Sequence, residues 1–452
     1  MLIRVENNEE LLNAWRKYPA LQQPTYPDLD ALASVAADLR TRPPLVFAGE
    51  VDRLTKDLAA ASRGEAFVLT GGDCAETFAQ SNADRIRAKV QTILQMAIVM
   101  SYGASTPIVK IGRIAGQYAK PRSADLETRG DEVLPSYRGD GVNSFEFTLE
   151  GRTPDPQRLL ELYQRSASSL NLIRAFTRGG YADLRQVHHW NQGFTDNPAY
   201  KQYEAMAVEL DRALRFMEAV GVDGENMRFV DFYSAHESLL LEYETAMTRT
   251  DSGSGKLYNT SAHYLWIGER TRDPQGAHVQ QAASVQNPIG VKIGPTTTVD
   301  QIKELASILN PEAIPGRLSL ITRMGASKLA DKLPALVAAV QSEGIPVLWI
   351  TDPMHGNTIT SSSGYKTRNF GDIMQEVHDF FGVLQAEGAI PGGVHVELTG
   401  DDVTEVVGGA EELSEEALAN RYETLVDPRL NHQQSLELAF ATAQILRESV
   451  KR

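Results

Sequence analysis

The stretch Ile345–Thr358, IPVLWITDPMHGNT, decides the predicted fold. It begins as an apolar, partly β-branched run that ends at Ile350, which is typical of a strand buried on both faces of a sheet. The chain then changes abruptly to polar residues, among them Asp352 and His355. Catalytic groups of a (β/α)8 barrel follow the C-terminal ends of its strands, so a metal-capable imidazole in this place makes the ends of the remaining strands the next residues to compare.

Length, charge and cysteine content narrow the class of protein. The chain has 452 residues, more than the roughly 250 of a bare (β/α)8 barrel, which predicts one domain with additions. The net charge of −15 argues against non-specific binding to nucleic acid or to an anionic membrane, so an anionic ligand must be held in a local basic pocket. The single cysteine excludes an intrachain disulfide framework. With no signal peptide and no apolar run long enough to span a bilayer, we expect a cytoplasmic protein.

Eight strand-like runs alternate with helical stretches along most of the chain. The strands are predicted at 67–69, 107–111, 229–232, 264–267, 289–293, 318–321, 345–350 and 394–398. The helices between and after them are predicted at 84–100, 239–247, 295–309, 328–341, 372–384 and 434–446. This alternation predicts an α/β fold, a closed parallel (β/α)8 TIM barrel with right-handed crossovers.

Two regions fall outside the alternation. Residues 1–64 are predicted to form an N-terminal helical extension, and 65–452 the catalytic barrel, which an inserted pair of amphipathic helices interrupts at about 155–221. The helices of the extension are predicted at 8–15, 27–39 and 52–64. The apolar stripes of both additions exceed what a barrel exterior needs, so we expect contacts of a homo-oligomer there. The residues between the paired helices that we interpret as packing residues, and not as metal ligands, are His188, His189 and Trp190.

Four metal-capable side chains follow three of the predicted strands. They come from the ends of strands one, seven and eight and from the loop beyond, and they are Cys74, His355, Glu397 and Asp427. In a closed barrel these strands are neighbours, so the four groups are expected to meet at one mouth. Taken alone, a cysteine such as Cys74 is typical of a small core residue. An aspartate before proline, such as Asp427, or a glutamate at a strand end, such as Glu397, is typical of a turn or a salt bridge. Together, a thiolate, an imidazole and two carboxylates can hold a divalent transition metal, although the mixed donor set does not select one ion.

A second group of residues at the strand ends is cationic. Its members, from strands two, four, five and six, are Arg113, Lys120, Arg122, Arg270, Lys292 and Arg323. A solvated charge is the usual explanation of any Lys or Arg. Lys292, however, alternates with Val291 and Ile293, and burying such a charge is costly unless an anion meets it. A ligand with phosphate or carboxylate groups is therefore predicted, and no Walker loop or dinucleotide fingerprint indicates a nucleotide.

Eight motifs occur in order along the chain. They are GGDCAETF (Gly71–Phe78), GRIAGQYAKPRS (Gly112–Ser123), WIGERTR (Trp266–Arg272), NPIGVKIGP (Asn287–Pro295), ITRMG (Ile321–Gly325), DPMHGNT (Asp352–Thr358), GGVHVELTG (Gly392–Gly400) and DPRLN (Asp427–Asn431). This set resembles the motifs of type II 3-deoxy-D-arabino-heptulosonate 7-phosphate (DAHP) synthase, the first enzyme of the shikimate pathway in plants and many bacteria. The similarity runs from about Pro24 to the end of the chain, and eight ordered motifs make coincidence implausible.

The resemblance implies a reaction and a site. The reaction is the metal-dependent condensation of phosphoenolpyruvate with D-erythrose 4-phosphate and water to give DAHP and phosphate, which leads to chorismate and the aromatic amino acids. The implied ligands of a divalent metal, Mn²⁺ or Co²⁺ first, are Cys74, His355, Glu397 and Asp427. The residues implied around phosphoenolpyruvate are Arg113, Glu269, Arg270, Lys292 and Arg323. Those implied for the sugar phosphate are Lys120, Arg122 and Ser123. The implied catalytic residues are Lys292, Glu269, His355 and Cys74.

The chain also departs from the family pattern. Thr351 stands where the family commonly has a second cysteine, which leaves the metal ligands intact but gives no support to a redox role at that position. No plastid transit segment is recognised before the barrel, so the plant localisation does not carry over. Feedback control by aromatic amino acids, assembly into a dimer or tetramer, and binding of a chorismate mutase are further expectations from the resemblance.

The implied mechanism leaves alternatives open. A metal that acts as a Lewis acid on the aldehyde lets C3 of the enol attack, after which water adds at C2 and phosphate leaves. Glu269 beside Arg270 would orient either that water or the arginine. One competing interpretation is a Schiff-base aldolase with Lys292 as its nucleophile. The other is a non-catalytic regulatory relative, against which the retention of all four metal ligands counts.

Overall fold

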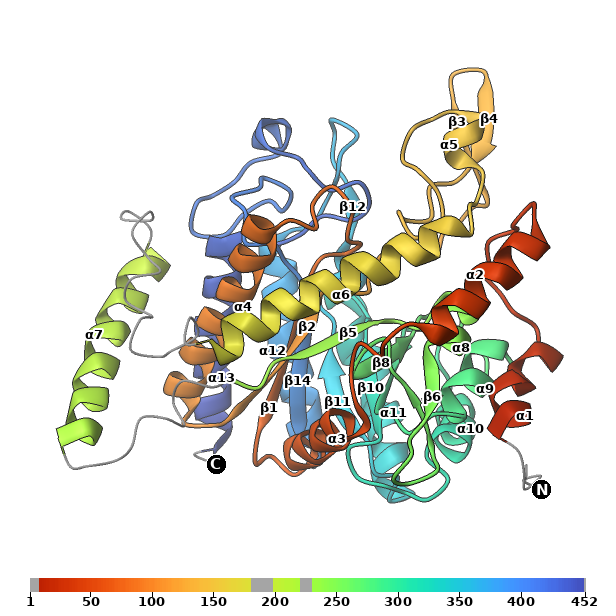
Figure 1. The fold of residues 1–452 in the computed structure, drawn as a ribbon. Coiled ribbons are helices and arrows are strands. Elements are labelled where there is room, and N and C mark those ends of the chain that lie inside the picture. The colour runs from red at the N-terminus through yellow and green to blue at the C-terminus, as the bar shows by residue number, and fades with distance from the viewer. Residues whose placement is uncertain (1–7, 180–197, 220–229, 451–452) are drawn as a thin grey trace.

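The computed structural model describes residues 8–179, 198–219 and 230–450, and eight parallel strands form a closed barrel at its centre (Figure 1). The strands are β1 (Phe67–Gly72), β2 (Ile108–Arg113), β5 (Tyr233–Glu237), β8 (Tyr264–Ile267), β9 (Ile289–Ile293), β10 (Leu318–Thr322), β11 (Leu348–Thr351) and β14 (Pro391–Glu397). Their order around the barrel is β1-β14-β11-β10-β9-β8-β5-β2. β1 pairs with β2 on one side and with β14, the last barrel strand along the chain, on the other, which closes the ring. The predicted TIM barrel is therefore confirmed.

Helices connect most of the strands and cover the outside of the barrel. They are α4 (Ala83–Ala104), α8 (Leu241–Met247), α9 (Ala277–Ala283), α10 (Val299–Leu309), α11 (Ala326–Ser342), α12 (Phe370–Ala386) and α13 (His432–Val450). In α10 the Thr298 hydroxyl accepts a hydrogen bond from the backbone N–H of Gln301, and the Gln301 side chain accepts one from Thr298. This capping box begins the helix, and its buried stripe of Ile302, Leu305 and Leu309 faces the strands.

One helix of the N-terminal extension closes the bottom of the barrel. Leu54 and Leu58 of α3 (Ala48–Ser62) are fully buried and belong to the same apolar cluster as Tyr264 and Ile350 from the barrel strands. Figure 1 shows α3 below the strands, at the end where β1 begins. The apolar stripe of this helix is therefore used within the chain and not in a subunit contact. Because α3 fills the N-terminal end, only the C-terminal end of the barrel remains for a site.

The start of α3 differs from the prediction. The helix begins at Ala48 and not at Asp52, because the Glu50 carboxylate accepts a hydrogen bond of 3.0 Å from the Phe47 backbone N–H and stabilises an earlier first turn. Phe47 is apolar and gave no capping signal. The sequence therefore predicted this helix but placed its start too late.

The remaining helices lie outside the barrel ring. They are α1 (Asn8–Asn13), η1 (Ala14–Lys17), α2 (Leu29–Thr41), α5 (Leu149–Arg152), α6 (Gln157–Arg178) and α7 (Pro198–Ala219), together with the short 3-10 helices η4 (His355–Asn357) and η5 (Glu416–Asn420) in loops that follow strands. The inserted pair is α6, which packs on α2 and α4, and α7, which lies beside α13 (Figure 1). His188, His189 and Trp190 lie outside the described residues. None of the described helices is both long and apolar enough to cross a bilayer.

The third strand does not lie where the apolar run predicted it. The run begins at Phe229, outside the described residues, whereas β5 extends over Tyr233–Glu237 and includes polar side chains. Two of those side chains are paired with other elements: Ser234 Oγ lies 3.1 Å from His263 Nδ1, and His236 Nε2 lies 2.8 Å from a Glu244 carboxylate oxygen in α8. Satisfied hydrogen bonds let polar residues occupy a buried strand, which an apolar pattern does not reveal.

Three short hairpins were not predicted. They are β3 (Leu126–Arg129) with β4 (Glu132–Pro135), β6 (Thr248–Thr250) with β7 (Leu257–Asn259), and β12 (Ile359–Thr360) with β13 (Lys366–Thr367). The first and third rise at the C-terminal end of the barrel (Figure 1). They extend the walls of that end beyond the strands.

Candidate active site

A cavity of about 380 Å³ opens at the C-terminal end of the barrel. The predicted site residues on its wall are Cys74, Arg113, Lys120, Arg122, Ser123, Glu269, Arg270, Lys292, Arg323, His355 and Asp427. Glu397 is not on the wall, because it is fully buried among its neighbours. The metal-capable group and the cationic group therefore share one space.

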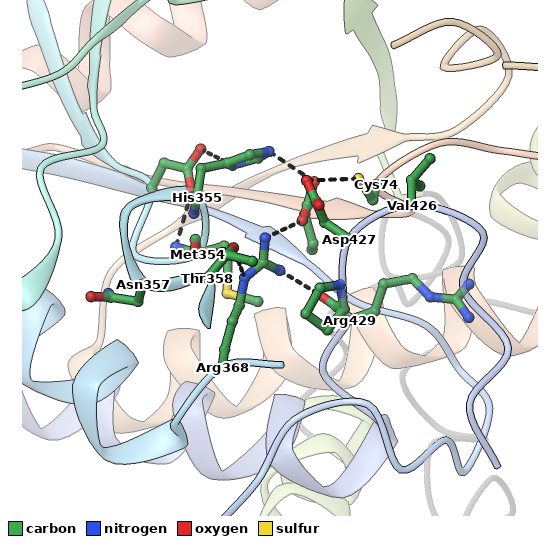
Figure 2. A network of polar contacts seen from close by, with 12 residues as sticks. Cys74, Met354, His355, Asn357, Thr358, Arg368, Val426, Asp427 and Arg429 are labelled. Atoms are coloured by element: carbon green, nitrogen blue, oxygen red, sulfur yellow. Dashed lines mark hydrogen bonds and ion pairs between the residues drawn. The ribbon is translucent and has the colours of Figure 1, made fainter. Parts of the chain in front are cut away.

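Three of the four predicted metal ligands form a compact cluster. One donor atom each of Cys74, Glu397 and Asp427 lies within 4.8 Å of the other two. His355 borders this cluster, with its Nε2 atom 3.0 Å from Glu397 Oε1 (Figure 2). Thiolate, carboxylate and imidazole donors at this separation are suited to a divalent transition metal, so the residues fit the ion that the donor types predicted.

The closure of the barrel brings these donors together. Gly72 at the end of β1 lies opposite Glu397 at the end of β14, and Cys74 follows two residues later. Gly72 has a φ of +145°, and a Cβ atom there would lie 2.6 Å from the Arg113 carbonyl oxygen. Only glycine permits this close approach of β1 and β2, from which Cys74 and Arg113 both enter the site.

Basic groups surround the Glu397 carboxylate. Arg113 Nη2 lies 3.1 Å from Oε1, and Arg368 Nη2 lies 2.8 Å from Oε2. Burial opposes ionisation of Glu397, but these guanidinium groups and His355 hold the pKa of its carboxyl well below its usual range. The carboxylate is therefore available as an anionic donor. Burial raises the pKa of the Cys74 thiol to about 12, and the charge of Glu397 acts in the same direction.

Lys120 lies at the metal-capable cluster, whereas the residues that follow it in its loop lie at the rim of the cavity. Its ammonium group contacts both Cys74 Sγ and the Asp427 carboxylate. Arg122 and Ser123 follow at the rim of the cavity, where Ser123 Oγ accepts a hydrogen bond of 2.8 Å from Arg270. The Lys120–Ser123 loop thus runs from the metal-capable cluster outward.

Lys292 and Arg323 form the inner part of the cationic group. Burial lowers the pKa of Lys292 to about 8, although the Asp352 carboxylate, which contacts its ammonium group, opposes this shift. The Lys292 ammonium group and the Arg113 guanidinium lie 6.0 Å and 5.0 Å from the centre of the Trp266 ring. Cations held over an aromatic floor, with little water around them, form a strong anion site.

Comparison with known proteins decides the family. The model of the Class-II DAHP synthetase family matches residues 10–443. The chain belongs to this family. A phospho-2-dehydro-3-deoxyheptonate aldolase of Streptomyces coelicolor is 55% identical over 449 residues, which cover 99% of this chain and 100% of that protein. The aldolase AroG of Mycolicibacterium smegmatis is 51% identical over 436 residues, covering 95% of this chain and 93% of that protein. The chain is therefore an enzyme with DAHP synthase activity in the shikimate pathway.

The solved structure of a phospho-2-dehydro-3-deoxyheptonate aldolase (DAHP synthase) of Thermotoga maritima aligns over 85% of this chain and 70% of that chain. Its sequence identity to this chain is 12% and its TM-score is 0.37.

Glu269 does not contact the arginine that the sequence suggested. Its Oε1 atom lies 3.1 Å from Arg272, whereas Arg270 turns to Ser123. Arg272, three residues after Glu269, reaches back to the Glu269 carboxylate, and the adjacent Arg270 does not. Adjacent residues in the sequence thus point in different directions in this DAHP synthase.

Glu237 is a carboxylate of the cavity that was not included among the predicted site residues. It ends β5 and lines the cavity, and its buried Oε1 atom makes no hydrogen bond within the described structure. Burial raises the pKa of this carboxyl, while His355, Arg113 and other cations of the site oppose the shift. A carboxylate after a strand, beside His236, was the available signal in the sequence.

Asp352 and Glu376 also support the site of this DAHP synthase. Asp352 is fully buried and contacts both Lys292 and His355 Nδ1, the latter at 2.7 Å. Glu376 of α12 accepts hydrogen bonds from the backbone N–H groups of Met324 and Gly325 and from Asn357 Nδ2. It therefore ties the loop after β10 to the loop after β11. Asp352 lay within a quoted motif, but no sequence pattern marked Glu376.

Proposed function

We propose that this DAHP synthase condenses phosphoenolpyruvate with D-erythrose 4-phosphate and water in the cavity at the barrel mouth, releasing DAHP and phosphate. The observation that carries the proposal is that three metal-capable residues, Cys74, His355 and Asp427, line the same cavity as the cationic group, with Glu397 buried beside them. The ligands of a divalent ion, Mn²⁺ or Co²⁺ by preference, would be Cys74, His355, Glu397 and Asp427. A bound metal ion supplies Lewis acidity for the aldehyde oxygen of the sugar phosphate.

The inner cations are proposed to bind phosphoenolpyruvate. Lys292 lies in β9, Arg323 directly follows the adjacent strand β10, and both line the cavity, as does Arg113, which lies beside Glu397. Their charges pair with the carboxylate and phosphate of the enol and offset the charge on the departing phosphate. Arg270 and Glu269 complete this part of the wall, where Glu269 holds Arg272.

The Lys120–Ser123 loop is proposed to bind D-erythrose 4-phosphate and to set its direction. Lys120 touches Cys74 and Asp427, so the aldehyde end of the sugar belongs beside it. Arg122 and Ser123 lie farther along the loop and suit the terminal phosphate, for which Arg122 provides a planar donor group. The aldehyde then lies beside the metal ligands and C3 of the enol.

Glu237 is proposed to orient the water that adds at C2. Its unpaired carboxylate oxygen is buried at the cavity, and its raised pKa brings it closer to the range in which a carboxylate accepts and returns a proton. Glu269, another carboxylate of the wall, also has an unpaired buried oxygen, but its Oε1 atom already holds Arg272, whereas the Glu237 carboxylate holds no side chain in the described structure. The geometry therefore favours Glu237 over Glu269 for this role.

A Schiff-base mechanism is the second candidate, because burial lowers the pKa of Lys292 to about 8. The Lys292 ammonium group contacts Asp352, however, and an ion pair of this kind favours the charged form that binds an anion. Borohydride treatment in the presence of either substrate distinguishes the two mechanisms. A covalent adduct on Lys292 would establish the Schiff base, and its absence in an active enzyme supports the proposed mechanism.

The proposed function is tested by following the loss of enol absorbance when D-erythrose 4-phosphate is added, with and without a chelator. We expect the chelator to abolish turnover and Mn²⁺ or Co²⁺ to restore it, because the clustered donors lose their ion. Full activity in exhaustively metal-free protein would exclude the metal-dependent mechanism.

We also propose that the chain forms a homo-oligomer, a dimer or tetramer, and acts in the cytoplasm. Leu29 of α2 is 69% exposed, and Val208 and Phe216 of α7 are each 63% exposed. These apolar side chains support contacts through the helical extension, 1–64, and the inserted pair outside the 65–452 barrel. Light scattering at micromolar concentration tests the assembly, and a strictly monomeric mass would contradict it. Pull-down with a chorismate mutase tests that further partner.

A further inference from the structure

Arg368 joins three of the four segments that carry the proposed metal ligands, those of His355, Glu397 and Asp427. It lies between β13 and α12, and its side chain is fully buried. Its Nε donates a hydrogen bond of 3.0 Å to Thr358 Oγ1, and its Nη1 donates to the Pro428 carbonyl oxygen. Its Nη2 lies 2.8 Å from Glu397 Oε2. Figure 2 shows the guanidinium group among these partners.

Each partner of Arg368 belongs to a different part of the metal-capable cluster. Thr358 stands three residues after His355, and Pro428 directly follows Asp427. Glu397 is itself a proposed ligand. The donors of a guanidinium group lie in one rigid plane, so a single group that holds all three partners also fixes their relative positions. A lysine ammonium is a point charge and cannot reproduce this planar arrangement.

The backbone that carries Arg368 is fixed as well. The Arg368 carbonyl oxygen accepts a hydrogen bond of 2.9 Å from Val407 N–H, and the Phe370 N–H donates one of 2.9 Å to the Val407 carbonyl. Thr367 Oγ1 donates to the Glu405 carbonyl oxygen at 2.9 Å. The guanidinium group therefore extends from a backbone segment that is anchored by contacts other than its own.

Charge neutralisation alone does not explain this arrangement. The Glu397 carboxylate already has Arg113 and His355 within 3.1 Å of its Oε1 atom. Two of the three Arg368 contacts go to uncharged oxygens, those of Thr358 and Pro428. Burying an arginine is costly, and a charge that served only to balance Glu397 would not need those two contacts.

We infer that Arg368 is a positioning residue of the metal centre, which holds Glu397, the Asp427 loop and the His355 loop in the arrangement that accepts the ion. The inference rests on the proposed metal-dependent function and deepens it, because Arg368 offers no lone pair to a metal. Loss of a residue that orients metal ligands typically weakens metal binding about 10- to 100-fold.

The test measures Co²⁺ binding to the full-length, metal-free protein by competition with a chromophoric chelator, together with the thiolate-to-Co²⁺ charge-transfer absorbance. Arg368→Lys keeps the positive charge and removes the planar donor group. We expect its Kd for Co²⁺ to rise about 10- to 100-fold and its charge-transfer band to shift. Binding of phosphoenolpyruvate to the metal-free variant should stay within about twofold of the unvaried protein, because Arg368 does not line the cavity.

Arg317→Lys is the matched control. Arg317 is also a buried arginine, but it lies at the opposite end of the barrel and donates to the carbonyl oxygens of Ala282 and Val285. This variant should lower thermal stability and leave Co²⁺ affinity unchanged. An equal loss of Co²⁺ affinity in the control, or an affinity within about threefold of the unvaried protein in Arg368→Lys, would overturn the positioning role.

A second variant decides the matter if Arg368→Lys does not fold. Thr358→Val removes one acceptor of the guanidinium group and keeps the side-chain shape, so we expect Co²⁺ binding to weaken about three- to tenfold. Unchanged affinity in a folded Thr358→Val protein would overturn the inference. If the unvaried protein itself binds no Co²⁺, the proposed metal function fails first, and that outcome is distinct from a failure confined to the variants.

Discussion

Replacing Arg122 with alanine should raise the KM for D-erythrose 4-phosphate and leave the KM for phosphoenolpyruvate nearly unchanged. The Arg122 side chain borders the cavity, and its guanidinium group makes no hydrogen bond or ion pair within the described part of the chain. Its removal therefore costs the free protein no internal contact, and the loss falls on the bound sugar phosphate. A hydrogen bond between charged groups contributes about 1.5–3 kcal/mol, which corresponds to a rise of about 10- to 150-fold in KM.

The assay is steady-state kinetics with each substrate varied in turn at saturating levels of the other. Arg63→Ala is the control, because Arg63 follows α3 at the other end of the barrel and pairs only with the exposed Glu65 in the described structure. Neither KM should change in the control. If Arg122→Ala raised only the KM for phosphoenolpyruvate, the proposed direction of the sugar in the Lys120–Ser123 loop would be wrong.

Three further predictions concern the enol site, the water and the closed end of the barrel. Above about pH 8 the buried Lys292 amine loses its charge, so the affinity of the metal-free protein for phosphoenolpyruvate should fall about tenfold per pH unit. Lys292→Arg keeps its charge at these pH values and should remove this dependence. The same pH dependence in both proteins would contradict the role of the Lys292 charge. Glu237→Gln should lower kcat about 100- to 10,000-fold with small changes in either KM, and an unaltered kcat in stopped-flow or steady-state assays would assign the water elsewhere. Leu58→Ala should lower the free energy of unfolding by about 2–5 kcal/mol in urea titrations without changing kcat per folded molecule, and a loss below about 1 kcal/mol would mean that α3 does not seal the barrel.

The strand and helix pattern was predictable because most barrel strands are buried on both faces. A run such as Ile289–Ile293 must then be almost wholly apolar, and a charged residue within it or directly after it marks the mouth. The same logic located Lys292 within one strand and His355 shortly after another, and both line one cavity. The apolar pattern did not predict β5, because this strand contains the polar residue His236, which is buried with Glu244 as its hydrogen-bond partner.

The supporting residues could not be predicted from the pattern. Arg368 and Glu376 act through contacts with segments that are distant in the sequence, and a single arginine or glutamate is ordinarily a solvated surface charge. The same applies to Glu269, whose partner is set by the turn of the loop toward Arg272 and not by adjacency. Spacing reveals which elements end at the mouth, whereas long-range pairing becomes visible only in three dimensions.

The pairing of β1 with β14 sets a timing constraint on synthesis. Cys74 and Asp427 are 353 residues apart in the chain. At about 5–20 residues per second, a ribosome needs roughly 20–70 s to pass from the thiol to the carboxylate. During that interval the Cys74 thiol lacks Asp427, and once β11 has been synthesised, β1 and β11 each present an open edge to other chains until β14 pairs with both. Chaperone protection of this unfinished barrel matters most just before the last strand emerges.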